Sequence, residues 1–211
     1  MCIRDRSGTA FLHGPLWLLA LLSMVVGNLA ALFQQNIKRM LGYSAIAQMG
    51  YVVMALLTGS SGGYEAAAFY LVVYAAMNLA AFGAVGALTG DDSGGRIDDL
   101  CGMGYHAPGR SAVLALAGIP PTAGFTGKFA LFRAALTGGE VALAVVGMLT
   151  AAASVYYYLR VVVALYLRPG TATAPEATLT TMIPLAVAAF LLVLWGIWPG
   201  LLLGITHTIT G

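Results

Sequence analysis

The chain has 211 residues, of which 60% are hydrophobic and 9% are charged. Because a soluble globular domain carries about 25% charged residues, this composition excludes an ordinary soluble fold. The net charge of +2 is too small to indicate a nucleic-acid partner, and Cys2 and Cys101 form no pattern that would hold zinc or an iron–sulfur cluster.

The chain starts with a polar and charged segment, MCIRDRSG. It lacks the apolar core and the cleavage site of a signal peptide. We expect residues 1–13 to be a leader that is non-native or disordered. The alternative is a short tail on one side of a membrane.

Six apolar segments follow, and each is long enough to cross a bilayer, which takes about 20 residues. They predict an all-α fold, a polytopic transmembrane helical bundle that forms a single membrane domain over residues 14–211 within a lipid bilayer. The expected spans are about 14–36, 38–58, 65–89, 111–136, 140–168 and 179–205.

Polar segments separate these spans and indicate their orientation. GSSGGY at 59–64 reads as a loop, and the long connection at 89–110 contains a short amphipathic turn at Ile97–Leu100. Arginines follow spans one, three and five, and the opposite side has acidic residues at 65 and 140. Lys/Arg-rich loops stay in the cytoplasm, so we expect the connections after these three spans there.

The second span opens with QQNIKRMLGYSAIAQMGY. At 100° per residue, Lys38 and Gln48 share one broad face with the small residues between them. In one interpretation Lys38 is a titratable relay, while Tyr43 and Gln48 orient water. In the other, Lys38 and Arg39 are simple anchors at the membrane surface.

Two later spans place polar side chains at helical spacing: Tyr70, Tyr74 and Asn78 in the third, and Ser154, Tyr157 and Arg160 in the fifth. The stripe in the third span favours hydrogen bonds between helices over a water chain. For the fifth span, two interpretations are equally supported. The tyrosine hydroxyls extend a water chain, or they form an aromatic belt at the membrane surface.

The fourth span contains AGIPPTAGFTGKF, residues 117–129. Pro120 and Pro121 lack a backbone N–H, and glycines such as Gly124 relax the backbone around them. This combination predicts a discontinuous helix around Pro120–Gly127. A break of this kind is tolerated in a membrane only where it is buried in protein or lines water.

Lys128 lies just after this expected break, far from either polar loop. A charge at the bilayer centre costs about 2.5–3.5 kcal/mol on insertion scales, and burial disfavours the charged form of a lysine. Lys128 beside exposed backbone groups therefore suits a site that takes up and releases protons. The alternative is a packing kink, with the lysine side chain extending to the membrane surface.

Three motifs, in this order and spacing, carry a resemblance to a known family: GNLAALFQQNIKRMLGYSAIAQMGY, AGIPPTAGFTGKF and SVYYYLRVVVALY. They resemble the antiporter-like membrane subunits of respiratory complex I, NADH–quinone oxidoreductase, and subunit N of the bacterial complex most of all. The resemblance runs from about Gly14 to the last residue. Members of the family have fourteen transmembrane helices, and this chain resembles the last six.

The resemblance implies a role for each matching residue. Lys128 corresponds to the lysine of a broken helix that loads a proton near the exit, and Lys38 to a lysine of a central polar axis. Tyr43 and Tyr157 match polar positions near that axis. Gln48 stands where the family often has a histidine, so one relay step is water-mediated or absent.

The segment before the broken helix is a second departure from the family. Only GRSAVLALA separates Pro108 from Gly118, which is fewer apolar residues than members of the family usually have. The first half-helix is therefore expected to be short by about two turns, although the whole span is still long enough to cross a bilayer.

The resemblance also implies a setting. No redox centre is expected on this chain, whereas NADH, FMN, iron–sulfur clusters and quinone are expected on the parent complex. The expected partners are the neighbouring complex I membrane subunits in a bacterial inner membrane, and the expected function is proton translocation driven by quinone reduction elsewhere. The alternatives are a subunit of a multi-component cation/proton antiporter and an inactive fragment.

Overall fold

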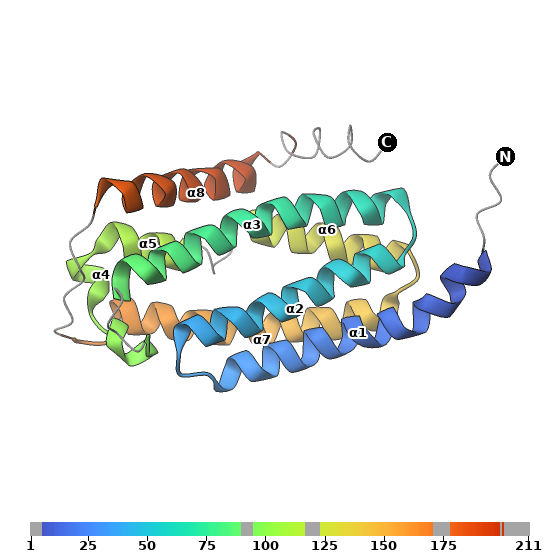
Figure 1. The fold of residues 1–211 in the computed structure, drawn as a ribbon, viewed down its shortest axis with the longest axis horizontal. Coiled ribbons are helices and arrows are strands. Elements are labelled where there is room, and N and C mark those ends of the chain that lie inside the picture. The colour runs from blue at the N-terminus through green and yellow to red at the C-terminus, as the bar shows by residue number, and fades with distance from the viewer. Residues whose placement is uncertain (1–5, 90–94, 117–122, 171–177, 199, 201–211) are drawn as a thin grey trace.

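The computed structural model describes residues 6–89, 95–116, 123–170, 178–198 and 200, and these residues form a bundle of helices (Figure 1). The all-α transmembrane bundle expected from the sequence is confirmed. The helices are α1 (Arg6–Phe33), α2 (Ile37–Leu57), α3 (Ser61–Thr89), a 3-10 turn η1 (Ile97–Leu100), α4 (Met103–His106), α5 (Pro108–Leu116), α6 (Ala123–Thr137), α7 (Val141–Tyr166) and α8 (Leu179–Ile197).

Five of the helices are long and apolar enough to cross a membrane: α1 from Phe11, α2, α3, α7, and α8 from Thr180. They run side by side, with α1 and α8 at opposite edges of the bundle (Figure 1). The expected fourth span falls on α5 and α6, which both pack against α3. Pro120 and Pro121, where the break was expected, lie outside the described residues, while Gly124 is buried in the first turn of α6.

Two expected boundaries were wrong. α1 begins at Arg6 rather than at residue 14, so part of the expected leader is helical. Apolar residues continue on the N-terminal side of Pro15, and His13 Nε2 lies 2.8 Å from Glu140 Oε1, which joins this end of α1 to the start of α7. α3 begins at Ser61, within the expected loop at 59–64, because Ser60 Oγ accepts the N–H of Gly63 at 3.1 Å and caps the helix.

Small residues let α1 and α2 pack backbone to backbone. A Cβ at Gly27 would lie 2.8 Å from the backbone nitrogen of Ala47, and one at Gly50 would lie 2.7 Å from Met24 Cγ. Such close contact is the usual way in which membrane helices associate, since lipid supplies no hydrophobic driving force between them. The pair α1–α2 therefore forms a rigid base for the polar groups described below.

The C-terminal ends of α1, α3 and α7 lie together at one end of the bundle, which we call the arginine-rich end (Figure 1). The expected turn at Ile97–Leu100 is present as η1. Two backbone bonds tie this region to the start of α2: Ile37 N donates to Gly95 O at 2.8 Å, and Ile97 N donates to Gln35 O at 2.9 Å. Arg168 Nη1 reaches Asp98 Oδ1 at 3.3 Å across the same end.

Candidate functional site

Lys128 points into the bundle. It lies on α6, is partly buried, and its Nζ is 5.7 Å from the centroid of the Tyr51 ring, a cation–π distance. Tyr51 is fully buried, whereas Phe125 and Phe129 on either side of Lys128 are mostly exposed. This arrangement favours a lysine that works inside the protein over one that extends along the helix to the membrane surface.

A glycine brings Lys128 to this position. A Cβ at Gly127 would lie 2.6 Å from Cδ2 of Tyr70, so α6 rests directly on the tyrosine ring of α3. Phe132 of α6 meets Tyr51 edge to face, with ring centroids 5.7 Å apart and planes at 72°. Aromatic rings from α2 and α3 therefore line the region around the amine, and the ring faces of such residues stabilise a cation.

Gln48 is held by Tyr70. The Tyr70 hydroxyl donates to Gln48 Oε1 at 2.6 Å, and Gln48 is 2% exposed. The rings of Tyr70 and Tyr74 are stacked, 6.0 Å apart. The polar stripe of the third span therefore includes a hydrogen bond between α2 and α3, as expected if these side chains join helices. The Tyr70 ring that makes this bond also packs against Gly127.

A chain of side-chain hydrogen bonds leads away from Tyr51 through α1, α2 and α7. Its members, in order, are Thr150, Tyr51, Asn28, Tyr157, Ser44 and Tyr158. We call this set the hydroxyl–amide chain. Because polar groups inside a membrane protein must find partners within the protein, the chain satisfies most of the polar side chains that these three helices bury.

Asn28 is the centre of the hydroxyl–amide chain. Its Nδ2 donates to the Tyr51 hydroxyl at 3.0 Å and to the carbonyl oxygen of Met24 at 2.8 Å. Its Oδ1 accepts from the Tyr157 hydroxyl at 3.1 Å. Asn28 is 1% exposed, so this amide has its hydrogen bonds supplied by the protein.

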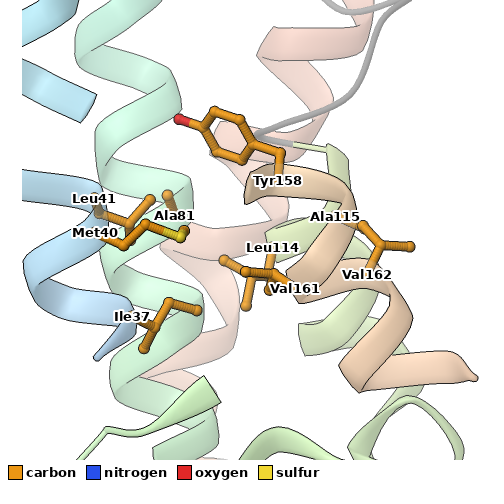
Figure 2. A pocket seen from close by; sticks show the side chains of 9 residues that line it. All are labelled: Ile37, Met40, Leu41, Ala81, Leu114, Ala115, Tyr158, Val161 and Val162. Carbon is orange, nitrogen blue, oxygen red and sulfur yellow. The ribbon is translucent and has the colours of Figure 1, made fainter. Parts of the chain in front are cut away.

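The chain ends at Tyr158, beside a small apolar pocket. Ser44 Oγ lies 3.1 Å from the Tyr157 hydroxyl and 3.0 Å from that of Tyr158. The pocket lies toward the arginine-rich end and is lined by Ile37, Met40, Leu41, Ala81, Leu114, Ala115, Tyr158, Val161 and Val162. In Figure 2 the Tyr158 hydroxyl points away from Ala115 and Val162. Apolar side chains therefore line the space beside Tyr158.

Comparison with known proteins identifies the family. Residues 6–154 match the transmembrane family described as NADH:quinone oxidoreductase/Mrp antiporter. The chain belongs to this family. The resemblance seen in the sequence motifs is thereby confirmed at the level of the family.

Named relatives of this family agree. The chain is 59% identical to NADH-quinone oxidoreductase subunit N of Geobacter metallireducens over 90% of its length, and 56% identical to the subunit N of Geotalea uraniireducens over 99%. It spans 42% and 46% of the length of these two relatives, and so less than half of each.

Solved structures share the fold. A chain of respiratory complex I from Thermus thermophilus superposes with a TM-score of 0.80 at 34% identity, over 90% of this chain and 45% of that one. The Mrp complex of Dietzia sp. matches with a TM-score of 0.83 at 20% identity, over 94% and 46%, which shows the fold alone.

The structure separates the residues that the family resemblance had singled out. Lys128, Gln48 and Tyr157 lie in the interior, at or near the hydroxyl–amide chain. Lys38 is exposed and Tyr43 is 37% exposed, but five residues on a helix put them about 140° apart around α2. This chain therefore does not bring Lys38 and Lys128 together.

Five members of the hydroxyl–amide chain were missed by sequence reasoning: Thr150, Tyr51, Asn28, Ser44 and Tyr158. Asn28 gave a usable signal, because an amide in the middle of an apolar span needs a partner inside the protein. The others are common in membrane helices and gave none. Among the described residues, no group of three His, Cys, Asp or Glu side chains is placed to hold a metal ion.

Proposed function

We propose that this chain forms part of an antiporter-like subunit that moves protons across a membrane, with Lys128 as the group that takes up and releases a proton. The observation that supports this proposal is the position of the Lys128 amine, inside the bundle and over the buried ring of Tyr51. A lysine is costly in a membrane and is a functional residue by default there. The Tyr51 hydroxyl in turn accepts from the buried amide of Asn28.

We also propose the setting of this activity. The relatives are named NADH-quinone oxidoreductase subunit N and come from bacteria, which supports a place in the bacterial plasma membrane beside other complex I membrane subunits. The energy would come from NADH oxidation and quinone reduction. Other subunits would hold the NADH, FMN, iron–sulfur clusters and quinone.

Further roles follow for the other residues. Tyr157 and Gln48 are proposed to shape the polar interior around Lys128 through their hydrogen bonds to Asn28 and Tyr70. Lys38 and Tyr43 are proposed to belong to a separate proton path that does not pass through the hydroxyl–amide chain. In this view, protons reach Lys128 by transfer through water and not through Lys38 directly.

The test is Lys128→Ala in the full-length subunit, within its assembled complex in membrane vesicles. We expect NADH oxidation and assembly to persist while proton uptake, followed with a pH-sensitive dye, falls strongly. Arg133→Ala is the matched control, because Arg133 is a cation on the exposed face of the same helix. Pumping at the wild-type rate in an assembled Lys128→Ala complex would contradict the proposal.

The competing function is a cation/proton antiporter, since the family includes such proteins. The two functions differ in their dependence on substrate. Proton movement that requires NADH and a quinone, and that is unaffected by replacing sodium with choline, supports the redox-driven subunit. Sodium-dependent proton movement without NADH supports the antiporter.

A further inference from the structure

The Asn28 amide divides the hydroxyl–amide chain into two groups of hydroxyls. Tyr51 and Thr150 lie on one side of it, and the Lys128 amine lies over the Tyr51 ring. Tyr157, Ser44 and Tyr158 lie on the other side, toward the arginine-rich end. Within the described residues, the hydrogen bonds that join the two groups pass through this amide.

The orientation of the amide is fixed by its neighbours. Nδ2 donates to the carbonyl oxygen of Met24, which can only accept. A flipped amide would place two acceptor oxygens against each other at this site. The N–H side of Asn28 therefore faces Tyr51, and the oxygen side faces Tyr157.

Hydroxyls and amides differ in their ability to transfer a proton. A hydroxyl both accepts and donates, so a row of hydroxyls passes a proton along by accepting on one side and releasing on the other. A carboxamide accepts only at oxygen and donates only at nitrogen. A proton would cross Asn28 only if the oxygen were protonated and the nitrogen deprotonated, which converts the amide into a high-energy imidic acid.

The directions of the hydrogen bonds agree with a blocked path. Because Asn28 donates to Tyr51, the single Tyr51 proton is free to point to Thr150, whose own hydroxyl donates to the carbonyl of Val146 at 3.0 Å. The Tyr51 side thus ends at a backbone carbonyl, which accepts but does not pass a proton on. On the other side, the single proton of the Tyr157 hydroxyl is donated either to Asn28 Oδ1 or to Ser44 Oγ.

We infer that Asn28 is a proton insulator: its amide holds Tyr51 and Tyr157 in place while preventing protons from passing between them. The inference rests on the proposed proton-carrying role of Lys128. A group that loads protons for transport must not be open to both sides of the membrane at once, because protons would then flow back. Asn28 closes the side-chain route between Tyr51, over whose ring the Lys128 amine lies, and the hydroxyls toward the arginine-rich end.

The experiment measures passive proton leak in vesicles that contain the assembled complex, with no NADH, after an imposed pH step and with the membrane potential clamped. In Asn28→Asp, a carboxyl group accepts and releases protons at the same site. We expect the leak to rise by at least about tenfold, below the roughly 10²–10⁴-fold that a positioned acid or base contributes to proton transfer. Asn28→Ser opens the same route with an uncharged hydroxyl, in case the carboxyl group impairs assembly.

Two further variants separate proton conduction from loosened packing. Asn28→Leu removes the hydrogen bonds but supplies no proton carrier, so its leak stays at the wild-type level. Asn28→Asp combined with Tyr157→Phe removes the next link and returns the leak to that level. A wild-type leak in assembled Asn28→Asp or Asn28→Ser, or a raised leak in Asn28→Leu, overturns the insulator.

This outcome is independent of the test of the proposed function. The leak is measured without substrate, whereas the role of Lys128 is judged from NADH-driven proton uptake. An unchanged leak in the Asn28 variants together with lost pumping in Lys128→Ala removes the insulator alone. Pumping that survives Lys128→Ala removes the proposed function, whatever the Asn28 variants show.

Discussion

Gly127 of α6 lies against the ring of Tyr70 on α3, and a Cβ at this glycine would come within 2.6 Å of Cδ2. The contact fixes how closely Lys128, the next residue, approaches the interior. Tyr70 in turn donates to Gln48 on α2. One glycine therefore sets the spacing of three helices around the candidate site.

Gly127→Ala is expected to destabilise the protein, because neither the fully buried Tyr70 ring nor the α6 backbone can give way easily. Inserting a methyl group into a packed interior costs about 1–3 kcal/mol. The thermal unfolding midpoint of the purified full-length subunit measures this loss. Gly86→Ala is the control, because no atom lies within 4 Å of a Cβ there and alanine favours the helix. Equal midpoints for the two variants would contradict the packing argument.

The Tyr70–Gln48 hydrogen bond is expected to contribute modestly to stability. Interhelical bonds of this kind average about 0.6 kcal/mol in membrane proteins. A double-mutant cycle with Tyr70→Phe and Gln48→Leu, read from detergent-induced unfolding, should give a coupling energy of that size. The same cycle with Tyr74→Phe should give almost none, since Gln48 Oε1 accepts from the Tyr70 hydroxyl and Tyr74 stacks on the Tyr70 ring. A large coupling energy in the second cycle would mean that Gln48 is stabilised through Tyr74 and not by the Tyr70 hydroxyl.

Arg160→Met is expected to loosen the arginine-rich end. The guanidinium donates to the carbonyl oxygen of Leu32, at 3.4 Å, and to that of Gln34. These carbonyls lie at the C-terminal end of α1, where no later helical N–H is available to bond them. Bonds from a charged donor are worth about 1.5–3 kcal/mol, so the unfolding midpoint should fall clearly.

Arg168→Met is the control for Arg160→Met. Its partner Asp98 is 63% exposed, and an exposed ion pair is worth about 0–1 kcal/mol. Hydrogen exchange at the start of α2 should rise in Arg160→Met alone. A rise in both variants would mean that positive charge at this end, and not capping of α1, is what matters.

Lys38→Ala and Arg39→Ala test the separate proton path proposed for Lys38. Both side chains are exposed cations in the first turn of this helix, so loss of charge and of helix anchoring is the same in each. If Lys38 takes up protons, NADH-driven pumping by the full-length subunit falls in Lys38→Ala and stays near wild type in Arg39→Ala. Equal effects would mean that both residues only anchor the helix.

The helices were predictable because their apolar runs exceed the length that a bilayer requires. The ends of the helices were less predictable, because short-range hydrogen bonds decide where a helix begins and ends. Ser60 starts α3 earlier than the glycines at 62 and 63 suggested. The sequence motif also pointed to Lys128, because a charged residue in an apolar span is conspicuous on its own.

The partners of the site residues could not be predicted. Asn28 and Tyr157 are 129 residues apart, and no periodicity within either helix indicates that they meet. The same holds for Ser44 and Tyr158, which are 114 residues apart. Helix periodicity gives the face on which a residue lies. Which face of which other helix it meets depends on packing, here set by glycines such as Gly27 and Gly50.

The short backbone bridge between Asn36 and Arg96 has a mechanical consequence. It joins the turn before α2 to the segment that begins at Gly95 by two backbone hydrogen bonds. A displacement of this segment must either break both bonds or move the first turn of α2 with it. Lys38 lies in that turn, so the position of this lysine is coupled to the position of the segment around η1.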